Sequence, residues 1–92
     1  MIVRISGEGQ FRLPDEDAER LNELDNRAVA AVDQGDETGF QELWSQMLEL
    51  VSSDGNKLED DELVESEVIL PPRDITIEEA RAEFSGEGLI PD

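Results

Sequence analysis

Residues 15–52 read DEDAERLNELDNRAVAAVDQGDETGFQELWSQMLELVS, and this stretch decides the fold. Apolar side chains recur at helical spacing through its first half, at Ala18, Leu21, Leu24, Ala28 and Val32. Gly35 ends that pattern, and Asp36 is suited to cap a second helix. Because so short a turn makes successive helices antiparallel neighbours, the stretch predicts a helical hairpin of residues 15–34 and 37–52.

The two helices have further signals of their own. Asp15, directly after Pro14, is predicted as the N-cap of the first helix. The second helix has an apolar arc of roughly 160°, formed by Phe40, Leu43, Trp44, Met47, Leu48, Leu50 and Val51. An arc this wide is expected to touch both the first helix and a sheet. Trp44 is the only tryptophan, and it suits either a core position or an interface anchor.

The segment before the helices predicts a β-hairpin. Residues 2–6 are short and β-branched, residues 10–13 alternate polar and apolar side chains, and Gly7-Glu8-Gly9 lies between them. A phosphate-binding loop is the other interpretation of such glycines, but it needs a helix directly after them, and here a strand is expected. The tetrapeptide SGEG recurs at 85–88, where Gly86 is expected to end the last helix. We therefore expect no phosphate site at either place.

The segment after the helical hairpin predicts a third strand and a third helix. Residues 68–70 form a short apolar strand, and Pro71-Pro72 set the direction in which the chain leaves it. Thr76 and Glu79 have the spacing of a capping box. A short helix should follow, with Ile77, Ala80 and Phe84 facing inward.

Taken together, these elements predict an α+β fold in a single domain of residues 1–92. A small three-stranded sheet, made of the N-terminal β-hairpin and the strand near residues 67–70, should pack on the antiparallel helical hairpin. A short C-terminal helix completes it.

Residues 53–67 are irregular and acidic, which raises the question of calcium binding. With Asp54 as the first ligand, Asn56 and Glu65 fall at the third and twelfth positions of an EF-hand loop. Leu58 stands where an oxygen ligand is needed, and Glu59 stands where the sharp turn needs glycine. We therefore interpret the segment as a solvated loop.

The charge balance is extreme, with 25 acidic residues against 7 basic ones and a net charge of -18. Disorder is disfavoured by a hydrophobic content of 37% with clear periodicity. Two interpretations remain: an acidic docking or nucleic-acid-mimicking face, and adaptation to molar salt, which screens self-repulsion. Carboxylates spread along the whole chain favour the second. Direct binding of nucleic acid is not expected, because the sequence has no basic patch.

The composition also argues against catalysis. The chain has no histidine and no cysteine, so the usual general base, thiol nucleophile and zinc ligands are missing. We expect no enzyme activity, no cofactor and no metal. The apolar runs are too short to span a membrane, and residues 1–4 do not begin a signal peptide, so a cytoplasmic protein without direct membrane insertion is expected.

Several pieces of the chain together resemble a known family. They are MIVRISGEGQFRLPDEDAERLNELDN, AAVDQGDETGF, DDELVESEVILPPRDITIEEARAEF and GEGLIPD. In this order and spacing they resemble the PspAA proteins, small proteins associated with phage shock protein A in archaea and actinobacteria. A member this acidic looks like one from a salt-loving archaeon.

The resemblance implies a non-enzymatic accessory or regulatory role in a phage-shock-protein-A-like envelope stress response. The implied partner is a phage shock protein A homologue, a membrane-associated coiled-coil protein, which could bring the chain to the membrane periphery. A generic acidic interaction module or nucleic-acid-mimicking inhibitor is the alternative. No catalytic residue is carried over from the family. The predicted partner-binding residues are the apolar ones at the strand exit and in the tail, namely Leu70, Pro71, Pro72, Leu89, Ile90 and Pro91.

Overall fold

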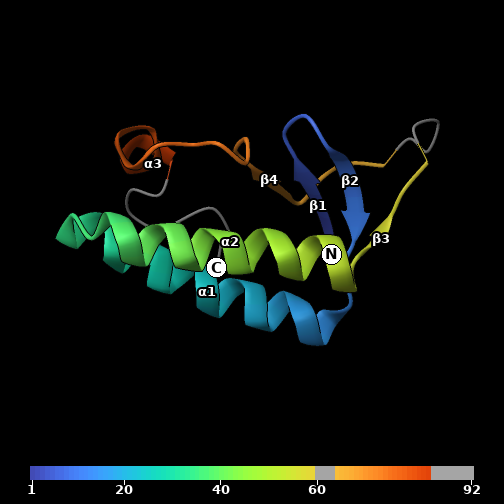
Figure 1. Cartoon of the computed structure of the whole chain (residues 1–92). Coiled ribbons are helices and arrows are strands. Elements are labelled where there is room, and N and C mark those ends of the chain that lie inside the picture. Colours follow the sequence, from blue (N-terminus) through green and yellow to red (C-terminus); the bar gives the residue numbers. More distant parts are fainter. Residues whose placement is uncertain (60–63, 84–92) are drawn as a thin grey trace.

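The computed structural model describes residues 1–59 and 64–83, which form a sheet, two long helices and a short third helix (Figure 1). In chain order the elements are β1 Ile2–Ile5, β2 Gly9–Arg12, α1 Asp15–Gln34, α2 Glu37–Asp54, β3 Asn56–Lys57, β4 Val68–Leu70 and α3 Ile77–Glu83. The predicted α+β class is confirmed.

The sheet has four strands in the order β3-β2-β1-β4. β1 pairs antiparallel with β2 and parallel with β4, and β2 pairs antiparallel with β3. The prediction of three strands was therefore one short. β3 lies in the segment interpreted as a loop, and both of its side chains are exposed. β3 pairs with β2 through backbone groups, so its residues show no alternation of apolar and polar side chains from which a strand could be predicted.

Glycine shapes both turns predicted from the sequence. Gly7 and Gly9 have φ angles of 84° and 114°, and the Glu8 amide donates to the Ile5 carbonyl at 2.9 Å, which closes the turn between β1 and β2. Gly35 has a φ of 70° and ends α1. Such left-handed angles are strained for residues with a Cβ, so glycine is the suitable residue here. The predicted β-hairpin and helical hairpin are confirmed.

The N-cap of α2 is the predicted residue, whereas the N-cap of α1 differs from the prediction. The Asp36 carboxylate accepts a hydrogen bond from the Gly39 amide at 3.0 Å and caps α2, as predicted. The N-cap of α1 is Pro14, whereas Asp15 was predicted. The Pro14 carbonyl accepts from the Asp17 and Ala18 amides, so Asp15 lies within the first turn. There its charge still complements the helix dipole.

The core lies between the helical hairpin and one face of the sheet. Val3 and Ile5 of β1, Phe11 of β2 and Val68 and Leu70 of β4 are all buried on that face. Helix α2 supplies Phe40 and Trp44, whose rings stack with centroids 6.4 Å apart. Trp44 is 1% exposed, so it is a core residue, and the alternative of an interface anchor is not supported.

The segment after β4 leads to α3 through the predicted capping box. The Thr76 hydroxyl accepts from the Glu79 amide at 3.2 Å, and the Glu79 carboxylate accepts from the Thr76 amide at 3.3 Å. Ala80 is buried and Ile77 is partly buried, whereas Phe84 lies outside the described residues. None of the helices within the described ranges has the length and apolar character needed to cross a bilayer.

Candidate functional site

The outer face of the sheet, turned away from the helices, follows from strand alternation. Side chains on a strand point alternately to the two sides, so Arg4, Gln10, Arg12 and Ile69 lie opposite the buried residues. The register sets Arg4 opposite Gln10 on one side and opposite Ile69 on the other. Arg12 stands opposite Ile2, one position along the same face from Arg4. We call Arg4, Arg12 and Ile69 the outer-face patch.

Exposure and charge distinguish this patch. Ile69 is 59% exposed, the most exposed of the large apolar residues in the described chain. Arg4 and Arg12 are both exposed, and neither forms a hydrogen bond or ion pair with another described residue. By contrast, Arg27 pairs with Glu23 at 2.8 Å, and Arg73 pairs with Glu8 at 2.7 Å.

Residues 64–67 border the patch. The Gln10 side-chain amide donates to the Val64 carbonyl at 3.0 Å and to the Ser66 hydroxyl at 2.7 Å. The Glu67 amide donates to the Ile2 carbonyl at 2.9 Å. These bonds hold the chain against β2 and β1 as it crosses to β4. Glu67 is exposed and is the acidic residue that flanks β4.

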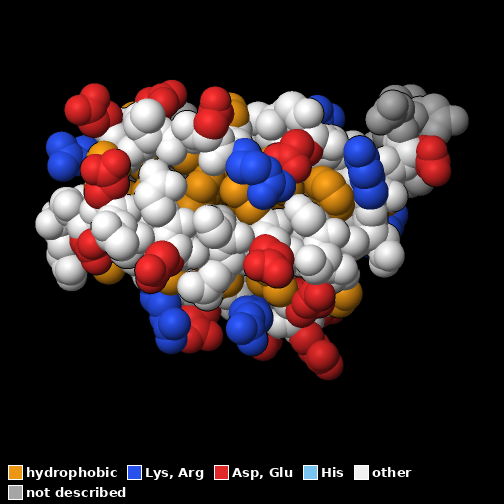
Figure 2. All heavy atoms as spheres, viewed as in Figure 1, with side chains coloured by type: hydrophobic (Ala, Val, Ile, Leu, Met, Phe, Trp, Pro, Cys, Tyr) orange, Lys and Arg blue, Asp and Glu red, His pale blue; other side chains and the backbone are white. Residues whose placement is uncertain are grey.

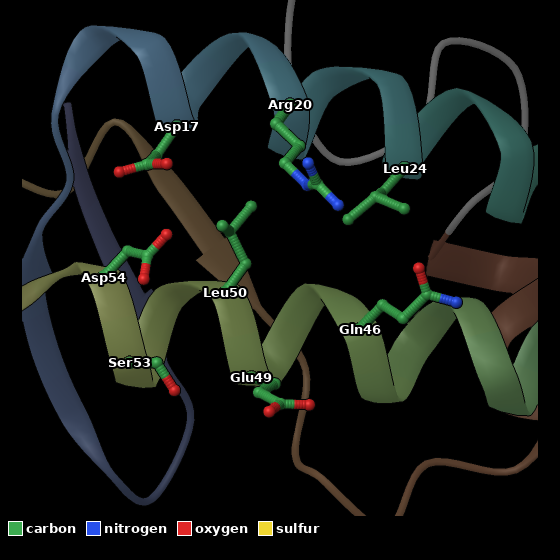
Figure 3. A pocket seen from close by; sticks show the side chains of 8 residues that line it. All are labelled: Asp17, Arg20, Leu24, Gln46, Glu49, Leu50, Ser53 and Asp54. Atoms are coloured by element: carbon green, nitrogen blue, oxygen red, sulfur yellow. The ribbon is translucent and has the colours of Figure 1, made fainter.

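A second feature is a groove along the seam between α1 and α2 (Figure 3). It has a volume of about 310 Å³ and is lined by Asp17, Arg20, Leu24, Gln46, Glu49, Leu50, Ser53 and Asp54. Figure 3 shows the Asp17 and Asp54 carboxylates pointing toward one another across the seam. We call this feature the seam groove.

The electrostatics of the seam groove are repulsive at the Asp17 end. Desolvation raises the pKa of Asp17 above 3.8, and the charge and hydrogen bond of Asp54 raise it further, while Arg20 acts in the opposite sense. Leu24 and Leu50 are 5% and 9% exposed, so the apolar floor already belongs to the core. The groove offers a polar rim for a cation and little apolar surface.

Converging metal ligands are not found in residues 1–59 and 64–83. No group of three or more histidine, cysteine, aspartate or glutamate side chains within these ranges could hold a metal ion. Residues 60–63 of the segment weighed for calcium lie outside the description, so the expectation of no specific calcium site stays a prediction.

Comparison with models of known protein families shows to which family the chain belongs. The family model of PspAA, the PspA-associated proteins, matches residues 1–92, which is the whole chain. The chain belongs to the PspAA family. A search of curated proteins found no match, and neither did a search of solved structures. The resemblance read from the sequence is thus confirmed, and the family name indicates association with PspA.

The predicted partner-binding residues of this PspAA protein are divided by the structure. Leu70 is 0% exposed and Pro71 is buried, so both side chains pack inward. Pro72 is exposed. Leu89, Ile90 and Pro91 lie outside the described residues, and their role stays a prediction.

Sequence reasoning missed Ile69, the residue exposed between the two buried ones. Three consecutive apolar residues do not reveal which of them points inward. Parallel pairing with β1 resolves it, because Val68 and Leu70 lie opposite the buried Val3 and Ile5. The signal that was available was Arg4, a charged residue between two apolar ones on the neighbouring strand.

Proposed function

We propose that this PspAA protein is a non-enzymatic accessory or regulatory protein that binds a PspA homologue directly and acts in an envelope stress response. The observation that carries the proposal is the family match over residues 1–92. A domain this small uses nearly all of its chain to form one core, so its function must be exerted from its surface. The family name supports PspA as the protein that this surface meets.

The side-chain chemistry supports a binding role over a catalytic one. With no histidine and no cysteine, general acid-base work would fall to a carboxylate held in a pocket. The seam groove places Asp17 and Asp54 together, but it is a shallow seam between two helices whose apolar residues are nearly buried. We infer that the domain binds a partner and transforms no substrate.

We attribute the acidity to a salt-rich cytoplasm, with the protein reaching the membrane periphery only through its partner. Figure 2 shows acidic side chains scattered over the visible face, interspersed with basic and uncharged ones. An inhibitor that mimics nucleic acid would instead carry carboxylates at phosphate-like spacing on one face. Together with carboxylates that are spread along the whole sequence, the scatter on this face favours general salt adaptation over a mimic. Direct binding of nucleic acid and insertion into a membrane do not enter the proposal.

Co-purification from the protein's own cells tests the proposal. An affinity-tagged chain should retain the PspA homologue in buffers of both low and high KCl concentration. A Leu89→Asp, Ile90→Asp double variant tests the predicted tail contact in the same experiment. Loss of the partner with the fold intact would identify the tail as an interface, and loss of the fold would assign the tail to the core. Retention of a nucleic-acid-binding protein in place of the homologue would favour the mimic and contradict the proposal.

A further inference from the structure

The outer-face patch combines an exposed apolar residue with two arginines that form no ion pair with a described residue. Ile69 is 59% exposed beside Arg4, and it lies on β4, an edge strand of the sheet. A partner can therefore approach it both across the face and from the edge. An exposed isoleucine on an edge strand is a site for association unless something covers it.

The charge of the patch is opposite to that of the molecule. The chain has 25 acidic and 7 basic residues, so two arginines on one face of the sheet make that face locally basic. Neither Arg4 nor Arg12 forms an ion pair with a described residue. The strand residues around them on this face are Ile2, Gln10, Asn56 and Ile69, and Glu67 continues the face before β4, opposite Ile2. Glu67 flanks the strand but forms no ion pair with either arginine. Within residues 1–59 and 64–83 the two guanidinium groups have no hydrogen-bond partner, so we assign their donors to another molecule.

We propose that the outer-face patch is the docking surface for the PspA homologue, and that the segment it receives presents an apolar side chain flanked by carboxylates. This inference rests on the proposed function and specifies its surface. Charge complementarity at contact distance chooses the occupant, because Arg4 and Arg12 place two cations on the same face as the exposed Ile69 in a molecule of net charge -18. Ile69 supplies the apolar contact, and the arginines supply orientation through paired hydrogen bonds to carboxylates.

The seam groove fits this occupant less well. Its rim carries Asp17, Glu49 and Asp54, which would repel carboxylates, and its apolar residues are already nearly buried. It would suit a basic segment instead. The two surfaces therefore select partners of opposite charge, and variants of each distinguish them.

The test measures the dissociation constant between the purified full chain and the purified PspA homologue of the same genome, by biolayer interferometry in about 0.2 M KCl. The variants are Arg4→Ala, Arg12→Ala, their double, and Ile69→Ser. Arg81→Ala is the matched control, because Arg81 is an exposed arginine on α3 that also forms no ion pair with a described residue. Melting curves of each variant verify that the fold is kept.

We expect each arginine variant to weaken binding about threefold and the double about tenfold, with Arg81→Ala unchanged. Ile69→Ser should weaken binding about tenfold. In about 2 M KCl the arginine effects should shrink while the Ile69 effect persists, because salt screens exposed charge pairs.

Three outcomes would overturn the inference. Equal losses for Arg81→Ala and the patch variants would show a general charge effect. Wild-type affinity in all patch variants, or a loss caused instead by an Asp17→Asn, Asp54→Asn double variant, would place the interface elsewhere and leave the proposed function standing. If the wild type fails to bind at both salt concentrations, both the proposed docking surface and the proposed direct binding of the PspA homologue are overturned.

Discussion

The indole nitrogen of Trp44 lies 3.2 Å from the backbone carbonyl oxygen of Arg73 and donates a hydrogen bond to it. The bond joins α2 to the segment that follows β4. The Arg73 guanidinium in turn contacts the Glu8 carboxylate with nitrogen–oxygen distances of 2.7 and 3.1 Å, at the turn between β1 and β2. Arg73 thus links the helical hairpin to the sheet. The segment that leaves β4 after Pro71-Pro72 is bonded to α2 through the Arg73 carbonyl and to the β1–β2 turn through the Arg73 guanidinium.

Replacing Trp44 with phenylalanine should lower the free energy of unfolding by about 1–3 kcal/mol, because it removes the hydrogen bond and leaves part of the buried indole volume empty. Urea unfolding followed by circular dichroism measures this. Arg73→Ala is the control, because it removes the exposed pair with Glu8 and keeps the backbone carbonyl that accepts from Trp44, so it should lower the urea midpoint less than Trp44→Phe does. A wild-type midpoint for Trp44→Phe would contradict the assignment of Trp44 to the core.

Gly35→Ala should destabilise the helical hairpin by about 1 kcal/mol, because the φ of 70° at this position is strained for alanine. Gly35→Asn should cost less, since asparagine tolerates the left-handed region better than alanine. Thermal unfolding of the three proteins gives the order. If alanine and glycine are equally stable, the turn between α1 and α2 does not have the described geometry.

Asp17→Asn should stabilise the protein at pH 7 and lose that advantage near pH 3. The pKa of Asp17 is raised above 3.8 in the folded state, so folding binds its proton more tightly. The folded state therefore loses stability relative to the unfolded state as pH rises through the window above 3.8. The amide cannot carry the charge that Asp54 repels.

The control for this effect is Asp15→Asn, in the same first turn of α1. Both substitutions remove a carboxylate that favours the helix N-terminus, but Asp54 acts on the pKa of Asp17. Asp15→Asn should therefore lower the melting temperature at pH 7. Equal effects of the two substitutions would show that the desolvation of Asp17 and its interaction with Asp54 are both unimportant for stability.

The sequence predicted the elements whose side chains carry a pattern. Apolar periodicity marked α1 and α2, and the glycines at 7, 9 and 35 marked the turns, because few other residues fit those backbone angles. β3 was missed because it pairs through its backbone alone. The burial of Asp25 was also not predicted. A charged residue on a helix is expected to face solvent, whereas the Asp25 side chain is fully buried.

The candidate surfaces were harder to predict, because they depend on which segments become neighbours. The seam groove exists because an antiparallel hairpin brings Asp17, at the start of α1, next to Asp54, at the end of α2. The outer-face patch requires the register between β1 and β4, which aligns Arg4 with Ile69. Neither juxtaposition has a signal in local spacing, although the helical hairpin, once predicted, implies the first.

Thermal stability should rise between about 0.1 M and about 2 M KCl, because screening relieves the self-repulsion of a net charge of -18. Chloride is the suitable anion, since sulfate stabilises most proteins through apolar burial. A melting temperature that stays flat across this range would mean that repulsion is unimportant, and the acidity would then need another explanation.

The most direct test of the central claim is the binding of the purified chain to the purified PspA homologue of the same genome, measured by isothermal titration calorimetry. We predict saturable binding with a defined stoichiometry in both low and high KCl, because apolar contacts persist when charges are screened. Heats no larger than those of dilution at both salt concentrations would contradict direct association and, with it, the proposed function.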